Sequence, residues 1–80
     1  MEEAKLFVGS LNYQVEEEKI RELFSEFGSI KSLLHFKDKG FAFIEFNSRK
    51  EAELAKNTLD GTELLGRKMN IDYARPKKKY

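Results

Sequence analysis

The side chains best suited to chemistry in this 80-residue chain lie in one short run, residues 39–46, which reads Lys-Gly-Phe-Ala-Phe-Ile-Glu-Phe. Successive side chains of a β-strand point to opposite faces, so both faces of this run are largely apolar. One face carries Ala42, Ile44 and Phe46, and the other carries Phe41, Phe43 and Glu45. Because a small sheet usually buries only one face, the two phenylalanines of the second face need a covering layer or a ligand. With a lysine just before them, they are suited to stack against nucleic-acid bases.

Alternating or short apolar runs predict four strands. They are expected at Lys5–Gly9, at Ile30–Phe36, within residues 39–46 and at residues 68–74, the last with Met69, Ile71 and Tyr73 on one side. The four-residue segment 37–40 between the second and third strands is typical of a hairpin, so these two strands are expected to be antiparallel neighbours.

Two helices are expected between the strands. The first covers residues 16–27, where apolar side chains recur at the spacing of one helical face and Gly28 supplies the stop. The second begins at a capping box of Ser48 and Glu51 and ends at Asp60 and Gly61. Its core stripe consists of Ala52, Ala55 and Leu59.

The resulting order, βαββαβ, predicts a ferredoxin-like α+β sandwich. Right-handed crossovers place both helices on one face of a four-stranded antiparallel sheet and leave the opposite face bare. The expected core consists of Ile20, Leu23, Phe24, Phe27, Ile44, Phe46, Met69 and Ile71. Phe41 and Phe43 then lie on the bare face.

The hairpin between the second and third strands decides what else reaches that face. A loop with an even number of residues places Phe36 opposite Phe41 and Leu34 opposite Phe43, whereas an odd loop presents His35. We favour the even loop, which adds Leu34 and Phe36 to the bare face and leaves His35 a partly buried residue without a catalytic role.

Composition excludes several kinds of site. The chain has 40% hydrophobic residues, enough for one core, and it contains no cysteine and a single histidine. Disulfides, thiol nucleophiles and cysteine or zinc sites are therefore excluded, and we expect neither a metal nor a cofactor. No apolar run approaches a membrane span of about 18 residues, and the acidic start at Met1 is unlike a signal peptide. We expect a soluble intracellular domain with no membrane partner.

Charge is nearly balanced, with 15 basic and 14 acidic side chains, but it is unevenly distributed. Acidic residues gather in the expected helices, at Glu16, Glu17, Glu18, Glu22, Glu26, Glu51 and Glu53. Basic residues gather in or beside the strands, at Lys5, Lys37, Lys39, Arg67, Lys68, Arg75 and residues 77–79. If helices and sheet form separate layers, the two signs of charge face opposite sides of the molecule.

These features together resemble the RNA-recognition-motif family over about residues 5–76, with residues 77–80 as a basic tail of a single domain, 1–80. Residues 39–46 satisfy all eight positions of that family's octamer. Residues 6–11, Leu-Phe-Val-Gly-Ser-Leu, resemble its hexamer, with Ser10 where asparagine is usual. Residues 73–76 are similar to the Hu and Sex-lethal families, and the short hairpin at 37–41 is similar to the paraspeckle family.

The resemblance implies a role for each matching residue. Phe7 and Phe43 would each stack one base, Phe41 would pack against sugars and Lys39 would meet a phosphate. Further candidate contacts are Lys5, Leu34, Phe36, Asn70, Arg75 and Lys77. The short hairpin should lower affinity, because most relatives have a longer basic loop there.

The function that follows is single-stranded RNA binding by a non-catalytic module of RNA processing or regulation, with single-stranded DNA as a second candidate ligand. The nucleus is favoured over the cytoplasm, and the isolated domain is expected to be a monomer. An alternative is a protein-interaction or dimerisation module that uses the aromatic face or the acidic first helix, with other domains of this family or other proteins as partners.

Catalysis is the third class considered. Small phosphatases share the βαββαβ layout, but they need a glycine-rich anion loop with a committed arginine. Residues 9–13, Gly-Ser-Leu-Asn-Tyr, offer neither, and no acid, base and nucleophile converge elsewhere in the sequence. We therefore expect no enzymatic activity.

Overall fold

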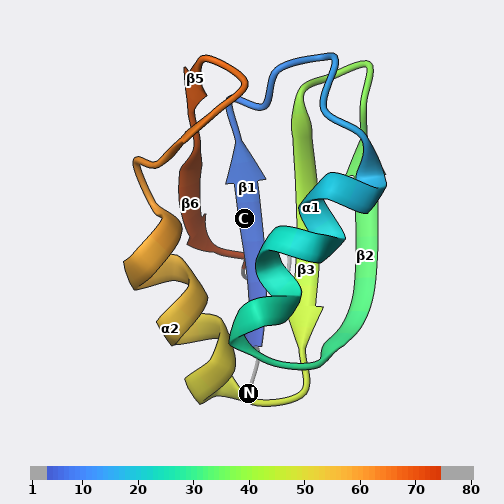
Figure 1. Cartoon of the computed structure of the whole chain (residues 1–80). Helices are drawn as coiled ribbons and strands as arrows, with labels where there is room; N and C mark the ends of the chain where they lie inside the picture. The colour runs from blue at the N-terminus through green and yellow to red at the C-terminus, as the bar shows by residue number, and fades with distance from the viewer. Residues whose placement is uncertain (1–3, 75–80) are drawn as a thin grey trace, which may run out of the picture.

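The computed structural model describes residues 4–74, which form two layers, a β-sheet and the two helices packed on one of its faces (Figure 1). In chain order the elements are β1 (Lys5–Gly9), α1 (Glu17–Phe24), the 3₁₀ turn η2 (Ser25–Phe27), β2 (Ile30–Phe36), β3 (Phe41–Phe46), α2 (Arg49–Leu59), β4 (Glu63–Leu64), β5 (Arg67–Lys68) and β6 (Asn70–Tyr73). Antiparallel pairing gives a main sheet with the order β2-β3-β1-β6. The predicted ferredoxin-like fold is confirmed. Within the described residues no helix is long and apolar enough to cross a membrane.

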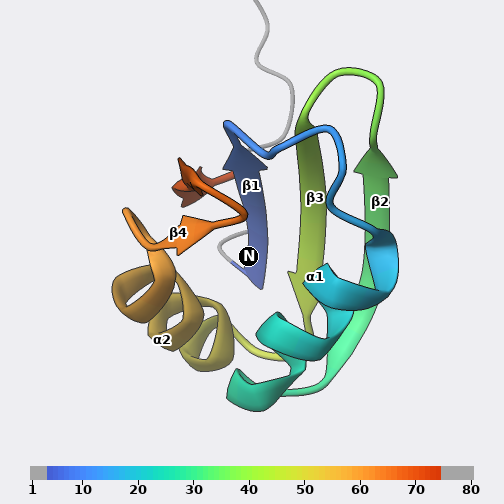
Figure 2. The ribbon, with the colours of Figure 1, turned by 45° about the horizontal axis from the view of Figure 1, so that its top comes forward.

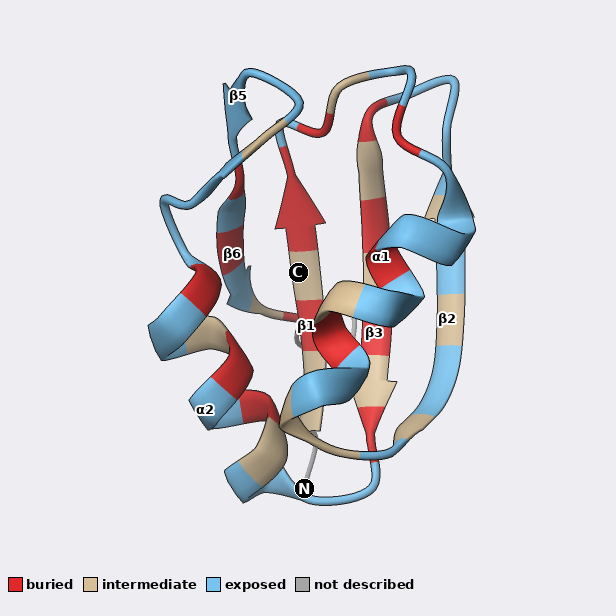
Figure 3. Cartoon of the chain, in the orientation of Figure 1, coloured by how far each residue is buried: buried red, intermediate tan, exposed pale blue. Residues whose placement is uncertain are grey.

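Both helices cover the same face of the main sheet, as the two views in Figures 1 and 2 show. Buried and less buried residues alternate along β1 and β3, and Figure 3 shows this banding on the strands. The sheet contributes Leu6, Val8, Ala42, Ile44, Phe46 and Ile71 to the core, and the helices contribute Ile20, Phe24, Ala52, Ala55 and Leu59. The core therefore lies entirely between the helices and one side of the sheet.

Register along β2 confirms the even hairpin loop. Leu34 pairs with Phe43 and Phe36 pairs with Phe41, while His35 is half-buried opposite Ala42 on the helix side. The pairing shifts between Ile30 and Ser32, and the extra residue in β2 marks a β-bulge. Strict alternation would put Ile30 on the same face as Phe36. The bulge instead lets Ile30 pack against the core while Phe36 stays on the open face.

The first helix is shorter than predicted. The α-helix ends at Phe24 and a 3₁₀ turn continues to Phe27, so Leu23 and Phe27 are only partly buried against the core. Gly28 has φ 160°, which is extended backbone and not a left-handed helix stop. What it supplies is space, because a Cβ built there would lie 2.6 Å from Cβ of Glu51 on α2. The glycine lets the end of the first helix approach the second.

The second helix follows its sequence pattern closely. The Ser48 hydroxyl accepts a hydrogen bond from the backbone N–H of Glu51 at 3.3 Å, which is half of the predicted capping box. Ala52, Ala55 and Leu59 are buried as expected. Small side chains on this stripe allow α2 to pack close to the sheet.

The predicted last strand, residues 68–74, is wrong in its boundaries. Arg67–Lys68 pairs with Glu63–Leu64 in a separate two-stranded hairpin, and only Asn70–Tyr73 joins the main sheet beside β1. The carbonyl of Met69 accepts a hydrogen bond from Gly61 at 2.8 Å and its N–H donates to the carbonyl of Thr62 at 2.9 Å. The backbone of Met69 therefore pairs with this segment and not with β1. The turn at Leu65 and Gly66 has positive φ at both residues, the geometry that two-residue hairpins favour. Met69 and Ile71 are nevertheless buried, as predicted.

Replacing Gly28 by alanine should destabilise the fold, because the added methyl would overlap the Glu51 side chain. Overpacking of this kind costs about 1 to 3 kcal/mol of unfolding free energy. Urea denaturation of Gly28→Ala measures the loss, with Ser29→Ala at the exposed neighbouring residue as the matched control. Equal stability of the two variants would contradict the packing role assigned to Gly28.

Candidate nucleic-acid interface

Three phenylalanine rings meet at the centre of the face that the helices leave open. Phe7 on β1 pairs with Phe43 on β3, and Phe41 lies two residues before Phe43 on the same side. Ring centroids are 5.6 Å apart for Phe7 and Phe41, 5.6 Å for Phe7 and Phe43, and 5.8 Å for Phe41 and Phe43. These separations are those of mutually packed aromatic side chains. The three rings pack against one another and stay half-exposed.

The neighbouring strand β2 extends this surface. The Phe36 centroid lies 5.0 Å from that of Phe41 and 6.2 Å from that of Phe43. Leu34 and Phe36 are 54% and 39% exposed, so both reach solvent on the open face as predicted. We call Phe7, Phe36, Phe41 and Phe43 the aromatic platform. An uncovered apolar surface of this kind marks a site of interaction.

Gly9 determines where the Phe7 ring lies. A Cβ built on Gly9 would be 2.8 Å from Cε2 and 3.1 Å from Cζ of Phe7, so the ring lies over the glycine along the strand. Any larger residue at position 9 would push the ring away. The hexamer glycine is therefore required here for space on the open face.

Charges of both signs flank the platform. The Lys5 ammonium is 5.9 Å from the centroid of Phe43, at the limit of a cation–π contact. On the edge strand β6, Asp72 pairs with Phe7 and Asn70 pairs with Gly9, so both side chains share the open face. Sequence reasoning included Asn70 but missed Asp72, although its place between the inward residues Ile71 and Tyr73 of the strand pattern already indicated this side. The open face is thus less uniformly basic than the charge pattern suggested.

The β2–β3 turn presents Lys39 at the edge of the platform. The backbone N–H groups of Lys39 and Gly40 both donate to the carbonyl of Phe36, at 2.9 and 3.0 Å, and Gly40 has φ 77°. Positive φ favours glycine at that position. Lys39 is exposed, and no ion pair to it is found among residues 4–74.

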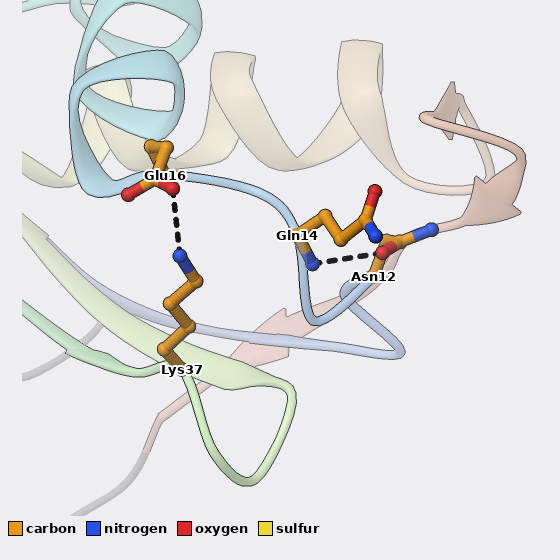
Figure 4. Close-up of polar contacts among 4 residues, drawn as sticks. All are labelled: Asn12, Gln14, Glu16 and Lys37. Carbon is orange, nitrogen blue, oxygen red and sulfur yellow. Dashed lines mark hydrogen bonds and ion pairs between the residues drawn. The ribbon is translucent and has the colours of Figure 1, made fainter.

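An ion pair fixes this turn to the start of α1. The Lys37 ammonium lies 2.7 Å from a carboxylate oxygen of Glu16, the N-cap residue of α1 (Figure 4). The hydrogen bond from Lys37, reinforced by its positive charge, lowers the pKa of the Glu16 carboxyl below its usual value. The pair is exposed, so its contribution to stability is small, but it links the turn that carries Lys39 to the helical layer.

Two predicted contacts, Arg75 and Lys77, lie outside the described residues. His35 faces the helical layer and not the platform, as the even hairpin loop predicts. Among residues 4–74 no three His, Asp or Glu side chains gather in a way that would hold a metal ion. Of the candidate residues that the structure describes, the aromatic platform, Leu34, Lys5 and Asn70 lie on the open face and Lys39 lies in the turn beside it, and the structure adds Asp72 to that face.

A four-stranded antiparallel sheet with both helices on one side and exposed aromatic side chains on the other is the architecture of a small nucleic-acid-binding domain. Residues 6–70 match the family model of the RNA recognition motif, and the chain belongs to that family. The match spans β1 to the start of β6 and includes the whole octamer.

Similar proteins include RbpF of Nostoc sp., whose name refers to RNA binding, at 38% identity over 78 residues that cover 90% of this chain and 74% of RbpF. Paraspeckle component 1 of Rattus norvegicus is 41% identical over 70 residues, which cover 88% of this chain but only 13% of that protein. The chain also spans 8% of the flowering time control protein FPA of Arabidopsis thaliana, at 41% identity. Most of these relatives thus extend far beyond the matching region.

Two solved structures have the same architecture. The C. elegans NONO-1 homodimer superposes with a TM-score of 0.87 at 37% identity, covering 94% of this chain and 30% of that chain. A Sex-lethal protein–RNA complex superposes with a TM-score of 0.84 at 24% identity, covering 95% and 49%. At 24% identity, the similarity to the Sex-lethal structure supports only the shared fold. The resemblance to the paraspeckle family is confirmed by paraspeckle component 1, whereas the likeness to Sex-lethal extends to the fold alone.

Replacing Gly9 by alanine should displace the Phe7 ring while leaving the core intact, because the new methyl overlaps the outer edge of that ring and makes only an ordinary contact with the Asn70 carbonyl. We expect altered aromatic chemical shifts for Phe7 and its platform neighbours, and unchanged shifts for the buried ring of Phe24. Aromatic ¹³C-correlated NMR spectra measure both sets. Unaltered Phe7 resonances in a folded Gly9→Ala protein would mean that the ring is not held over the glycine.

Proposed function

We propose that this domain binds single-stranded RNA on its open sheet face, with one base stacked on Phe7 and another on Phe43. The observation that carries the proposal is the aromatic platform, in which four rings, with centroids of neighbouring rings 5.0 to 6.2 Å apart, share one face that neither helix covers. Single strands are the fitting ligand, since their unpaired bases are free to lie flat on aromatic rings. Family membership supports the same ligand class.

Each candidate residue has a place in this proposal. Phe41, between Phe36 and Phe7, would contact the sugars, and Lys39 at the platform edge would meet a phosphate. Lys5 would add a second cation close to Phe43, and Leu34 with Phe36 would widen the apolar contact. The Asn70 amide on β6 both donates and accepts hydrogen bonds, which suits it to read a base edge. Arg75 and Lys77 are proposed as phosphate contacts from the end of the chain.

The size of the platform sets the expected strength of binding. Each base–aromatic stack contributes about 1 to 3 kcal/mol. Two or three stacks, less the cost of ordering the strand, correspond to dissociation constants of about micromolar order for the domain alone. Asp72 beside Phe7 opposes any phosphate that comes near, so it steers the backbone toward Lys5 and Lys39 and away from β6.

The wider role is also a proposal. Residues 1–80 form one RNA-recognition-motif unit that binds without catalysis in RNA processing or regulation. Nuclear location is supported by the similarity to paraspeckle component 1. Single-stranded DNA is a second ligand of the same face, because stacking does not require the 2′-hydroxyl. Linked modules bind far more tightly than one, so a chain that contains this unit with others would gain affinity.

Protein partners belong to the proposal as well. The NONO-1 homodimer is an assembly of chains of which this one covers 30%, so its dimer contacts need not lie in the shared domain. We therefore propose that the isolated domain is a monomer and that its partners include proteins, other domains of the same family among them.

Replacing Phe43 by alanine should weaken binding of short random-sequence RNA by several-fold to a hundredfold, as expected for the loss of one stack. Phe7→Ala should act similarly. The matched control is Leu54→Ala, which removes an exposed apolar side chain from α2 on the opposite layer. Titration followed by NMR or calorimetry measures affinity, and circular dichroism confirms folding. Unchanged RNA affinity in a folded Phe43→Ala protein would contradict the proposal.

Salt dependence tests the phosphate contacts. Two to four contacts should make the logarithm of the binding constant fall with the logarithm of salt concentration at a slope of about 0.7 per contact. Lys39→Gln should reduce the slope by about one such contact. Lys50→Gln, an exposed lysine of α2, removes the same charge from the opposite layer and should leave the slope almost unchanged. Equal slopes for both variants would exclude Lys39 as a contact.

A further inference from the structure

The edge strand β6 places two polar side chains beside the ring of Phe7. Asp72 lies directly opposite Phe7 in the register, and Asn70 lies opposite Gly9. The Phe7 ring extends along β1 over Gly9, because a Cβ built on that glycine would be 2.8 Å from Cε2 of the ring. Directly opposed residues on antiparallel strands have Cβ atoms about 4.5 to 5.5 Å apart. A base stacked on Phe7 therefore has one edge within reach of β6.

The carboxylate of Asp72 is held in place but keeps most of its capacity for hydrogen bonds. Its Oδ1 accepts a hydrogen bond from the backbone N–H of Tyr73 at 2.8 Å. An ionised carboxylate accepts up to about four hydrogen bonds and donates none. Asp72 is exposed, and among residues 4–74 its side chain has no ion-pair partner and no second hydrogen bond. Its Oδ2 atom is therefore free to accept from a ligand.

The cations of the open face lie on the other side of Phe7 from Asp72. Strands β3 and β6 flank β1 on opposite sides (Figure 1). The Lys5 ammonium reaches toward β3, 5.9 Å from the centroid of Phe43, and Lys39 lies in the turn that leads into β3. Phosphates are attracted to that side and repelled by Asp72. Because the Watson–Crick edge of a base points away from its sugar, that edge then faces β6.

The four bases differ in what this edge offers to an acceptor. Guanine has two adjacent donors, N1–H and the N2 amino group, which match the two oxygens of a carboxylate. Adenine and cytosine each offer one amino group beside a ring nitrogen that is itself an acceptor, and uracil offers one N–H between two carbonyls. An acceptor-only side chain meets lone pairs on those three bases. The base edges of single-stranded RNA are open to be read in this way.

We infer that Asp72 selects guanine for the nucleotide stacked on Phe7, by accepting hydrogen bonds from N1–H and from the N2 amino group. Asn70, two residues away on the same face of β6, donates from its amide to the O6 carbonyl beside N1–H. The inference rests on the proposed RNA binding, because it assigns a base to one of the two stacked positions. It also gives the carboxylate on this face a role other than repulsion of phosphate.

The experiment measures the affinity of the domain for RNA pentamers with one variable base between two uridines on each side. Guanine at the centre should bind about fivefold or more tightly than adenine, cytosine or uracil, the discrimination expected of one bidentate contact to a base. Inosine at the centre, which lacks only the N2 amino group of guanine, should bind more weakly than guanine. Calorimetry or NMR titration gives the affinities.

Asp72→Asn should remove the preference, because an amide presents one acceptor and one donor where the carboxylate presents two acceptors. The matched control is Glu45→Gln, which removes the same charge from the same face, where Glu45 lies opposite Lys5. The control should strengthen binding of all the pentamers together and keep the ratio between guanine and uracil. Circular dichroism confirms that both variants are folded.

Loss of the guanine preference in Asp72→Asn but not in Glu45→Gln supports the inference. Equal affinity of the unmodified domain for the four natural pentamers overturns it and leaves RNA binding intact. A preference that survives in Asp72→Asn, or that also disappears in Glu45→Gln, overturns it in the same way. Failure of every pentamer to bind would contradict the proposed function itself, and the inference with it.

Discussion

The alternation of side chains along the paired strands β1 and β3 is the constraint on which the rest of this molecule depends. Burial of Leu6, Val8, Ala42 and Ile44 against the helices fixes the register of these strands, since a slip by one residue would turn every core side chain outward. The same alternation then forces Phe7, Phe41 and Phe43 onto the other face. Stability and binding thus come from opposite sides of the same two strands, and neither helix needs to take part in recognition.

Close approach between elements depends on three glycines that differ in what they permit. Gly9 leaves room for the ring of Phe7, and Gly28 leaves room for Glu51 on the second helix. Gly40 has positive φ, its carbonyl accepts a hydrogen bond from the backbone N–H of Leu11, and its lack of a side chain leaves room for the ring of Tyr13. Of these three glycines only Gly40 requires the left-handed region. At the other two positions the missing side chain is what matters.

Much of the fold and of the platform follows from local patterns, and the errors arise where distant contacts outweigh them. The even hairpin loop and the exposure of Leu34 and Phe36 were predictable, because register in a tight hairpin is set by its own residues. The bulge near Ile30 was not, since it resolves a conflict between that residue and Phe36 over which face each one occupies. The early end of α1 at Phe24 was likewise not predictable from helical periodicity, because the 3₁₀ turn that follows it keeps Phe27 against the core and lies next to α2.

The sequence by itself determined the family, the order of elements and the residues of the platform, because these depend on period-two alternation and a motif read within single strands. Only the tertiary structure placed Asp72 beside Phe7 and paired the backbone of Met69 with Gly61 and Thr62. It also brought Tyr13, Lys39 and Arg67 together in the lining of one pocket. Those three residues belong to segments far apart in the chain. Their meeting results from hydrogen bonds between loops, and loops have no periodicity from which it could have been predicted.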